Sequence, residues 1–227
     1  MRAPVSVVIP TLNAAAVLPA CLAALYEGVQ AGIIRELIVV DGGSDDDTRT
    51  IADEAGATLV SSAPSRGGQL RAGVAASKGD WVLVVHADTC LEEGWSDVAE
   101  AHFATSRKAG YFHLSFDQGG MAARFVAGWA NLRSRLFGLP YGDQGLLIAR
   151  DVYDAHGGFE DIPLMEDVAM ARALKGQLTP LQAKAITSAD KYQRQGWLRR
   201  GTRNLSTLVR YLVGVSPQTL AESYQRP

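Results

Sequence analysis

Short, uninterrupted apolar runs alternate with longer segments of helical periodicity along the first 90 residues. Residues 5–9, 36–40 and 81–85 are runs of this kind, which is typical of strands buried on both faces. Between these runs, apolar residues recur three or four positions apart, as in helices that cover a sheet. The order predicts a parallel sheet with helices on both faces. We expect strands at 5–9, 36–40, 57–61 and 81–85 and helices at 15–27, 44–55 (with Ser44 as N-cap) and 66–77.

After residue 90 the alternation of strand and helix is less regular. The whole pattern still predicts the α/β class, as a doubly wound, mostly parallel sheet with helices on both faces and a C-terminal amphipathic helical tail. We divide the chain into a domain at 1–190 and a basic amphipathic extension at 191–227, packed on that domain, on a partner or on a membrane. We expect helices at 94–107, 121–137, 151–156, 165–175 and 196–213 and strands at 110–116, 145–149 and 180–187.

The composition is that of an ordinary soluble globular protein. Hydrophobic residues make up 47% of the 227 residues, and 22 Lys and Arg against 24 Asp and Glu leave a net charge of −2. This composition argues against a wholly disordered chain and against a generally basic nucleic-acid binder. We see no apolar run of the roughly 18 residues that a membrane span needs, and no signal peptide. We therefore expect a cytoplasmic protein in which Cys21 and Cys90 are reduced thiols.

The net charge conceals an asymmetry between the body of the chain and its tail. Residues 181–227 hold 8 Lys and Arg against 2 Asp and Glu, whereas residues 1–180 hold 14 against 22. A basic amphipathic helix can lie on an anionic membrane surface. The alternatives are a helix whose apolar side packs on the domain or on a second copy in a homodimer, and a simple solvated helix.

Polar residues follow three of the predicted strands. Thr11 and Asn13 come after the first strand, Asp41 after the second, and His86 and Asp88 after residues 81–85. In an open parallel sheet, ligands bind beyond the carboxyl ends of the strands. The alternative is that these residues only form turns, which Asn and Asp favour. Because three strands end in this way on one edge, the ligand-site interpretation is favoured.

Several familiar motifs are absent from the sequence. The first strand is followed by Pro10 and Thr11 rather than by the glycines of G-x-G-x-x-G, so a dinucleotide site of the usual kind is not predicted. The chain also lacks G-x-x-x-x-G-K-[ST], H-E-x-x-H and G-x-S-x-G. A P-loop nucleotide site, a zinc protease and a serine hydrolase are thus unsupported.

A second cluster lies at 163–167, where Glu166 and Asp167 open a predicted helix. A helix N-terminus stabilises anions, and a carboxylate held there near the sheet edge is suited to take a proton from a hydroxyl. The alternative is that both acids only cap the helix.

These segments together resemble family 2 glycosyltransferases of the GT-A fold, over about residues 4–175. The matching pieces are VSVVIPTLN (5–13), ELIVVDGGSDDDT (36–48), SRGGQLRAG (65–73), GDWVLVVHADT (79–89), GGF (157–159) and MED (165–167). The YGDQG segment at 141–145 and the short length resemble a bacterial subgroup described as radical-SAM/selenodomain-associated or arsenosugar-type transferases.

The resemblance implies an inverting transfer of a sugar from a nucleoside-diphosphate sugar to an acceptor hydroxyl, with Asp167 as general base and Glu166 supporting it. Gly67 and Gly68 would allow a close backbone approach. Asp143 and Gln144 would contact sugar or acceptor hydroxyls, or else form a polar turn. Many acceptors in the family are lipid-linked, which makes peripheral contact with the inner face of the membrane plausible. The implied nucleotide-sugar-binding residues are Pro10, Thr11, Asn13, Asp41, Gly43, Arg66, Gln69, His86 and Ala87.

The sequence departs from the family pattern at two places. His86 replaces the first acid of the D-x-D-like motif, so Asp88 is the remaining ligand for Mg²⁺ or Mn²⁺. The usual Q-x-x-R-W segment is matched only in part by residues 193–197. The implied diphosphate contacts in this region are Arg194, Arg199 and Arg203, for which a solvated helix is the alternative.

Two other functions compete with sugar transfer. A sugar-phosphate nucleotidyltransferase would need a glycine-rich, basic loop after the first strand, and residues 10–13 lack it. A non-catalytic nucleotide-binding protein would explain His86, but the intact Glu166 and Asp167 argue against it.

Overall fold

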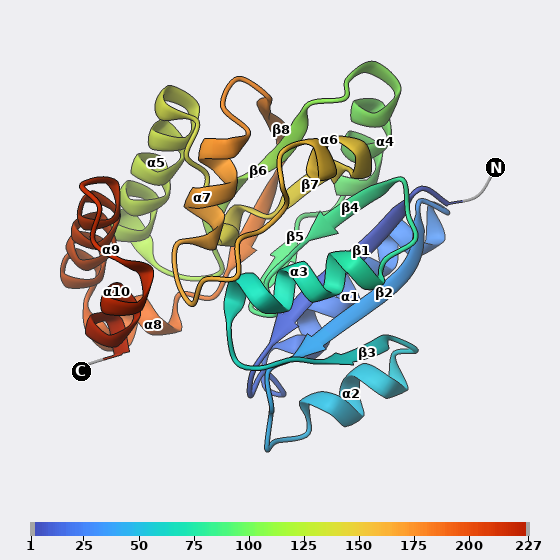
Figure 1. Ribbon diagram of the computed structural model, residues 1–227, viewed down its shortest axis with the longest axis horizontal. Coiled ribbons are helices and arrows are strands. Elements are labelled where there is room, and N and C mark those ends of the chain that lie inside the picture. The colour runs from blue at the N-terminus through green and yellow to red at the C-terminus, as the bar shows by residue number, and fades with distance from the viewer. Residues whose placement is uncertain (1–2, 226–227) are drawn as a thin grey trace.

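The structure, a computed structural model, describes residues 3–225. Its strands are β1 (Val5–Thr11), β2 (Ile34–Asp41), β3 (Thr58–Ser61), β4 (Trp81–Val84), β5 (Thr89–Leu91), β6 (Ala109–Phe116), β7 (Leu146–Ala149) and β8 (Leu178–Thr187). They form one sheet in the order β3-β2-β1-β4-β7-β6-β8-β5 (Figure 1). Strands β7 and β5 run opposite to the others. The predicted α/β fold with a mostly parallel sheet is confirmed.

Helices cover both faces of this sheet (Figure 1). Successive side chains of β1 point to opposite faces, so Val7 and Ile9 enter one core and Val8 enters the other. Helix α3 (Arg66–Ala76) packs closely on β1 at Gly73. A Cβ atom on Gly73 would lie 2.4 Å from a Val8 methyl carbon, so only glycine allows this close approach. The helices are α1 (Leu18–Gln30), α2 (Thr48–Glu54), α3 (Arg66–Ala76), α4 (Trp95–Thr105), α5 (Gly120–Phe137), η1 (Gly142–Gln144), α6 (Arg150–Ala155), α7 (Glu166–Ala173), α8 (Asp190–Gln195), α9 (Trp197–Leu212) and α10 (Pro217–Gln225).

Helix α2 differs from its prediction. It begins at Thr48 rather than at Ser44, and Ser44 is not its N-cap. The Ser44 hydroxyl instead donates a hydrogen bond to Asp41 at 2.5 Å and accepts one from the Asn13 N–H at 2.8 Å. The serine therefore joins the loops after β1 and β2. The sequence also did not predict β5, α8 and α10, which are short elements.

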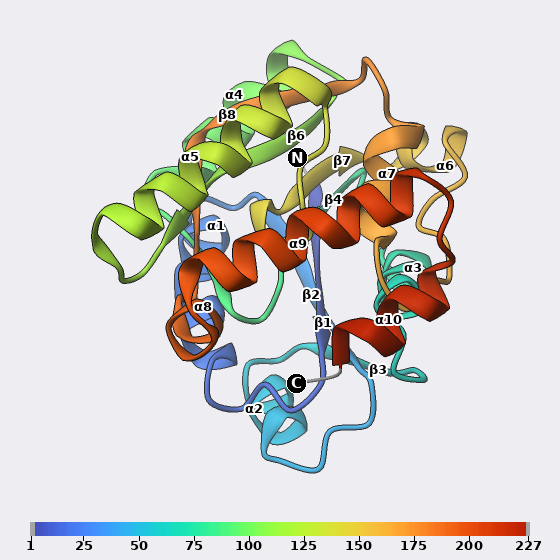
Figure 2. The ribbon, with the colours of Figure 1, turned by 90° about the vertical axis from the view of Figure 1, so that its left-hand side faces the viewer.

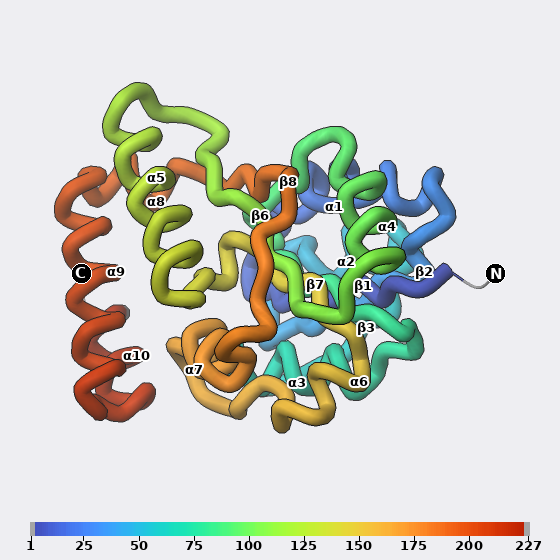
Figure 3. Tube along the Cα trace, turned by 90° about the horizontal axis from the view of Figure 1, so that it is seen from above, coloured from blue at the N-terminus to red at the C-terminus, as the bar shows by residue number. Residues whose placement is uncertain are grey.

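The C-terminal helices lie at the end of the molecule opposite the N-terminus (Figures 1 and 3). Leu208 of α9 and Leu220 of α10 are buried in a cluster with Val168 of α7. The segment after residue 190 thus packs on the body of the protein. No helix within residues 3–225 has both the length and the apolar character required to cross a bilayer.

Candidate active site

A cleft of roughly 860 Å³ opens beyond the carboxyl ends of β1 and β4. Its walls come from the first turn of α3, the start of η1 with the preceding Tyr141, the start of α7 and the helices α8 to α10. In Figure 2, α9 crosses this side of the molecule. The predicted site residues that line the cleft are Pro10, Thr11, Asn13, Arg66, Gln69, His86, Ala87, Asp88, Asp143, Glu166 and Asp167. The predicted site residues Asp41, Gly43 and Gln144 are not part of its lining.

Asp41 lies directly behind the cleft wall, at the end of β2, with 2% of its surface exposed. Its carboxylate accepts hydrogen bonds from the backbone N–H groups of Gly43 and Ser44 at 3.2 and 3.1 Å, besides the Ser44 hydroxyl. Asn13, at a positive φ of 51°, accepts a hydrogen bond from the N–H of Asp45 at 2.9 Å. These contacts fix the loops after β1 and β2. The nucleotide-binding role of Asp41 and Gly43 stays a prediction.

Gln69 connects α3 to the ends of the first two strands. Its buried amide nitrogen donates to the carbonyl oxygens of Thr11 and Val40, each at 2.8 Å. Gly67 lies so close to the segment at 160–162 that an added Cβ would be 1.9 Å from the carbonyl oxygen of Glu160. The close approach at Gly67 is therefore to the protein's own backbone, which the sequence did not reveal.

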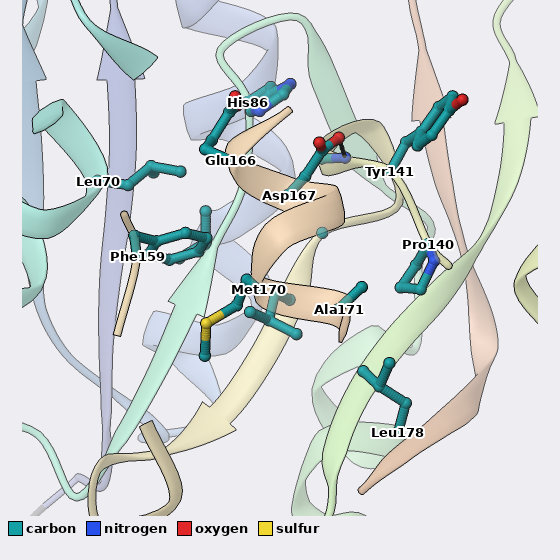
Figure 4. Close-up of a pocket in the computed structure, with 14 residues that line it drawn as sticks. Leu70, His86, Pro140, Tyr141, Phe159, Glu166, Asp167, Met170, Ala171 and Leu178 are labelled. Carbon is teal, nitrogen blue, oxygen red and sulfur yellow. Dashed lines mark hydrogen bonds between the residues drawn. The ribbon is translucent and has the colours of Figure 1, made fainter. Parts of the chain in front are cut away.

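The adjacent carboxylates Glu166 and Asp167 open α7, as predicted. Met165 precedes them at a φ of 71°, a left-handed conformation that is uncommon for a residue other than glycine. The Asp167 carboxylate accepts a hydrogen bond from the backbone N–H of Gly142 at 2.7 Å. Figure 4 shows Asp167 directed toward the loop that carries Tyr141. Helix α7 and this loop thus share one hydrogen bond at the cleft.

Glu166 is almost fully buried, with 1% of its surface exposed. Burial, with the negative charge of Asp167, raises the pKa of Glu166 to about 8, and the positive charge of Arg66 opposes the shift. Among the described residues, the Glu166 Oε2 atom has no hydrogen-bond partner. Glu166 and His86 line the same small pocket (Figure 4). At neutral pH, Glu166 is therefore mainly protonated.

The His86 ring lies against Gly142, the first residue of η1. A Cβ atom on Gly142 would lie 2.5 Å from the imidazole carbon Cε1, so a larger residue at 142 would displace the ring. Burial and the positive charge of Arg66 lower the pKa of His86, although Asp88 and Asp143 oppose the shift. The sequence drew attention to the YGDQG segment at 141–145. In the structure, the first glycine of this segment, Gly142, is the residue that lies against His86.

Asp143 and Gln144, from the same segment, have different surroundings. Burial raises the pKa of Asp143, which lies in the cleft near His86 and Asp167. Gln144 is fully buried, donates to the Phe112 carbonyl oxygen at 3.1 Å and accepts from the Ser134 hydroxyl at 2.6 Å. These contacts favour the polar-turn interpretation of Gln144.

Asp88 forms an ion pair with Lys191 of α8, at 3.1 Å between Oδ2 and Nζ. Burial alone would raise the pKa of Asp88, but the positive charge of Lys191, together with His86 and Arg66, holds it below its ordinary value. No group of three His, Cys, Asp or Glu side chains within residues 3–225 is placed to hold a metal ion. A divalent ion at Asp88 would therefore need ligands from elsewhere, and a bound diphosphate supplies suitable oxygens.

The C-terminal helices contribute cleft residues that the sequence did not predict. Of the predicted arginines, Arg194 lines the cleft, whereas Arg199 and Arg203 do not. Arg200 lines it instead, and its buried Nε atom has no hydrogen-bond partner among the described residues. Helical spacing could have identified these cleft residues, because it places three of them on one face of α9. These are Arg200, Asn204 and Thr207.

The family of the chain follows from comparison with known proteins. A model described as Glycosyl transferase family 2 matches residues 6–123. The chain belongs to this family. The narrower resemblance to the radical-SAM/selenodomain-associated subgroup stays a prediction.

Two curated relatives come from Mycobacterium tuberculosis. A PGL/p-HBAD biosynthesis glycosyltransferase is 40% identical over 101 residues, which cover 41% of this chain and 39% of the relative. An uncharacterized glycosyltransferase is 41% identical over 91 residues, which cover 40% of this chain and 39% of the relative. The chain thus matches only about 39% of the length of each relative.

Solved structures share the GT-A fold. Glucosyl-3-phosphoglycerate synthase from M. tuberculosis, solved with Mn²⁺ and UDP-glucose, has a TM-score of 0.57 at 22% identity and covers 78% of this chain and 68% of that one. S. aureus TarS 1-349 has a TM-score of 0.62 at 14% identity and covers 96% of this chain and 68% of that one. These similarities concern the fold alone.

Proposed function

We infer that the cleft binds a nucleoside-diphosphate sugar and transfers its sugar, with inversion, to an acceptor hydroxyl. The observation that carries this inference is the position of Asp167, a carboxylate held at the start of α7 in the same cleft as the polar ends of β1 and β4. Family membership and the UDP-glucose bound by a protein of the same fold support the donor class.

Asp167 serves as the general base in this proposal. It takes the proton of the acceptor hydroxyl while the acceptor oxygen bonds to the anomeric carbon. The bond from that carbon to the diphosphate oxygen breaks, and its electron pair leaves with the nucleoside diphosphate. Glu166, whose pKa is raised, keeps its proton at neutral pH and so adds little negative charge beside the base.

The donor lies along the ends of β1 and β4 and the first turn of α3. Thr11, Asn13 and Gln69 lie on the nucleotide side, where the loops are held by their own hydrogen bonds. Arg66 and Lys191 supply positive charge near the diphosphate. Asp88 would hold Mg²⁺ or Mn²⁺, and such an ion, when bound, stabilises negative charge on the leaving group. The complex with Mn²⁺ of a protein of the same fold supports the choice of ion.

The acceptor side is assigned to the loop with Asp143 and to α9. Asp143 faces the cleft and is a candidate contact for an acceptor hydroxyl. The glucosyl-3-phosphoglycerate synthase neighbour was also solved with phosphoglyceric acid. A lipid-linked acceptor is our working hypothesis for this chain. We also propose that residues 1–190 form the catalytic domain and residues 191–227 an extension that completes the cleft.

A donor titration tests the proposed function. UDP-, GDP- and dTDP-sugars are titrated into the full chain by calorimetry, with and without Mn²⁺. We expect one nucleoside-diphosphate sugar to bind, with an affinity that rises with Mn²⁺. Preference for a nucleoside triphosphate would favour the nucleotidyltransferase alternative. Binding without any sugar transfer to added acceptors or water would favour a non-catalytic nucleotide-binding protein.

A further inference from the structure

Helix α5 exposes its large apolar side chains and buries its small ones. Met121, Phe125 and Leu136 are 80%, 71% and 64% exposed, and Trp129 and Leu132 are each 46% exposed. Their spacing of four, four, three and four positions aligns them in one stripe along the helix. The residues that α5 buries on its other side include Ala123, Ala127 and Ala130.

Helix α9 carries a second stripe of this kind. Its exposed apolar residues are Leu198 (75%), Leu205 (41%), Val209 (50%) and Leu212 (45%). The two helices meet at their N-terminal ends, where an added Cβ on Gly119 would lie 2.6 Å from the ring of Trp197. Figures 2 and 3 show both helices at the same end of the molecule. We call the nine side chains of the two stripes the α5–α9 face.

The charges on these two helices are all positive. Residues 120–137 and 197–212 contain no Asp or Glu, and exposed arginines flank the stripes. These arginines include Arg124, Arg135 and Arg199. Apolar side chains bordered by arginine are complementary to an anionic lipid surface, where the rings and chains enter the headgroup boundary. A second copy of this chain, meeting the face about a two-fold axis, would instead bring arginines against arginines.

We propose that the α5–α9 face docks on the surface of an anionic lipid bilayer. Nine large apolar side chains on two adjacent helices exceed the scattered apolar residues that a surface normally exposes. The opposite side of α9, with Arg200 and Asn204, lines the cleft. Docking therefore places the C-terminal wall of the cleft next to the bilayer. The docking itself does not depend on the proposed sugar transfer.

Vesicle co-sedimentation of the full chain tests this proposal. We use vesicles of phosphatidylcholine alone and vesicles with about 30% phosphatidylglycerol, at low and at physiological salt. The wild-type chain should sediment with the anionic vesicles and not with the neutral ones. The double variant Phe125→Ser, Leu136→Ser should lose at least roughly tenfold in partitioning, because two large apolar side chains no longer enter the lipid.

The matched control is Val29→Ser on α1, because Val29 is 51% exposed but lies outside the α5–α9 face. It should bind vesicles as the wild type does. Trp129 gives a second readout, because it is exposed whereas Trp81 and Trp95 are buried and Trp197 is only partly exposed. Vesicles should shift the fluorescence of the wild type to the blue and shift that of Trp129→Phe less.

The proposal is overturned if the wild type stays in the supernatant, or if the control loses as much binding as the double variant. It is also overturned if light scattering shows a dimer that the double variant abolishes, because the face would then join two copies. Thermal unfolding verifies that the variants fold, and donor titration, which should be unchanged, separates lipid docking from the proposed function.

Discussion

The two sides of the cleft differ in how their polar atoms are paired. On the nucleotide side, Asp41 accepts four hydrogen bonds and the Gln69 amide nitrogen donates two, all within the protein. The opposite side is formed by η1 with the preceding Tyr141, by α7 and by α9. There, buried polar atoms of Tyr141, Glu166 and Arg200 have no hydrogen-bond partner among residues 3–225. Because an unpaired buried polar atom costs free energy of folding, such atoms in a cleft are suited to bind a ligand. The hydrogen bonds of the nucleotide side thus stabilise the fold, whereas the unpaired atoms of the opposite side lower its stability, as expected if that side binds a ligand.

The largest effect is expected on the opposite side, from Asp167→Asn. The amide still accepts the hydrogen bond of Gly142 but does not take a proton, so turnover should fall by about 10²–10⁴-fold. Donor affinity, measured by calorimetry, should remain nearly unchanged. The control is Asp154→Asn on α6, away from the cleft. Full activity of Asp167→Asn would remove this residue as the base.

Gln69→Ala tests the nucleotide side. The carbonyl oxygens of Thr11 and Val40 lose their shared donor, and we expect the free energy of unfolding to fall by about 1–3 kcal/mol. Denaturant unfolding measures the change, with Gln30→Ala at the exposed end of α1 as the control. If the two variants were equally stable, the nucleotide side would not have the stabilising role that we assign to it.

Glu166→Gln should have the opposite effect on stability, in a way that depends on pH. The pKa of Glu166 is raised in the folded chain to about 8, so the unfolded chain loses this proton first as pH rises. The wild type should therefore lose stability relative to the variant between pH 4.5 and 8, and the full difference should persist above pH 8. Thermal midpoints across this range, with the exposed Glu160→Gln as the control, test the sign. A constant difference at all pH values would contradict the raised pKa.

The smallest effect is expected for Lys191→Ala. The ion pair with Asp88 is partly exposed, and such pairs contribute about 0–1 kcal/mol. Its removal frees Asp88, so Mn²⁺ should bind up to roughly fivefold more tightly in the presence of UDP. Lys184→Ala breaks a comparable ion pair with Glu92 outside the cleft and serves as the control. Weaker Mn²⁺ binding in Lys191→Ala would show that the lysine assists the ion rather than competing with it.

The sequence predicted the first half of the fold well because its strands are continuous apolar runs. The pairing of β7 between β4 and β6 depends on distant segments, and β5 has only three residues, Thr89–Leu91, so neither has a clear local pattern. Helix α5 shows a different limit. The sequence predicted a helix over residues 121–137, but not that Ala123 and Ala127 face inward while Phe125 is exposed.

Most of the predicted site residues line the cleft, because they follow strands or open a helix. Lys191 and Arg200 were not predicted, because their roles depend on how α8 and α9 pack against the sheet. Gln144 is the opposite case. It was predicted to lie in the site, but its polar side chain forms its hydrogen bonds inside the protein.

The ion pair between Asp88 and Lys191 joins residues 103 positions apart in the chain. It links the end of the central sheet to α8, and α9 follows α8 after a single residue. A cation bound to Asp88, or a diphosphate bound near Lys191, changes the charges that hold this ion pair together. We therefore expect a ligand in the cleft to shift the positions of α8 and α9. The ligand-bound and ligand-free molecules should then present different surfaces at their C-terminal end.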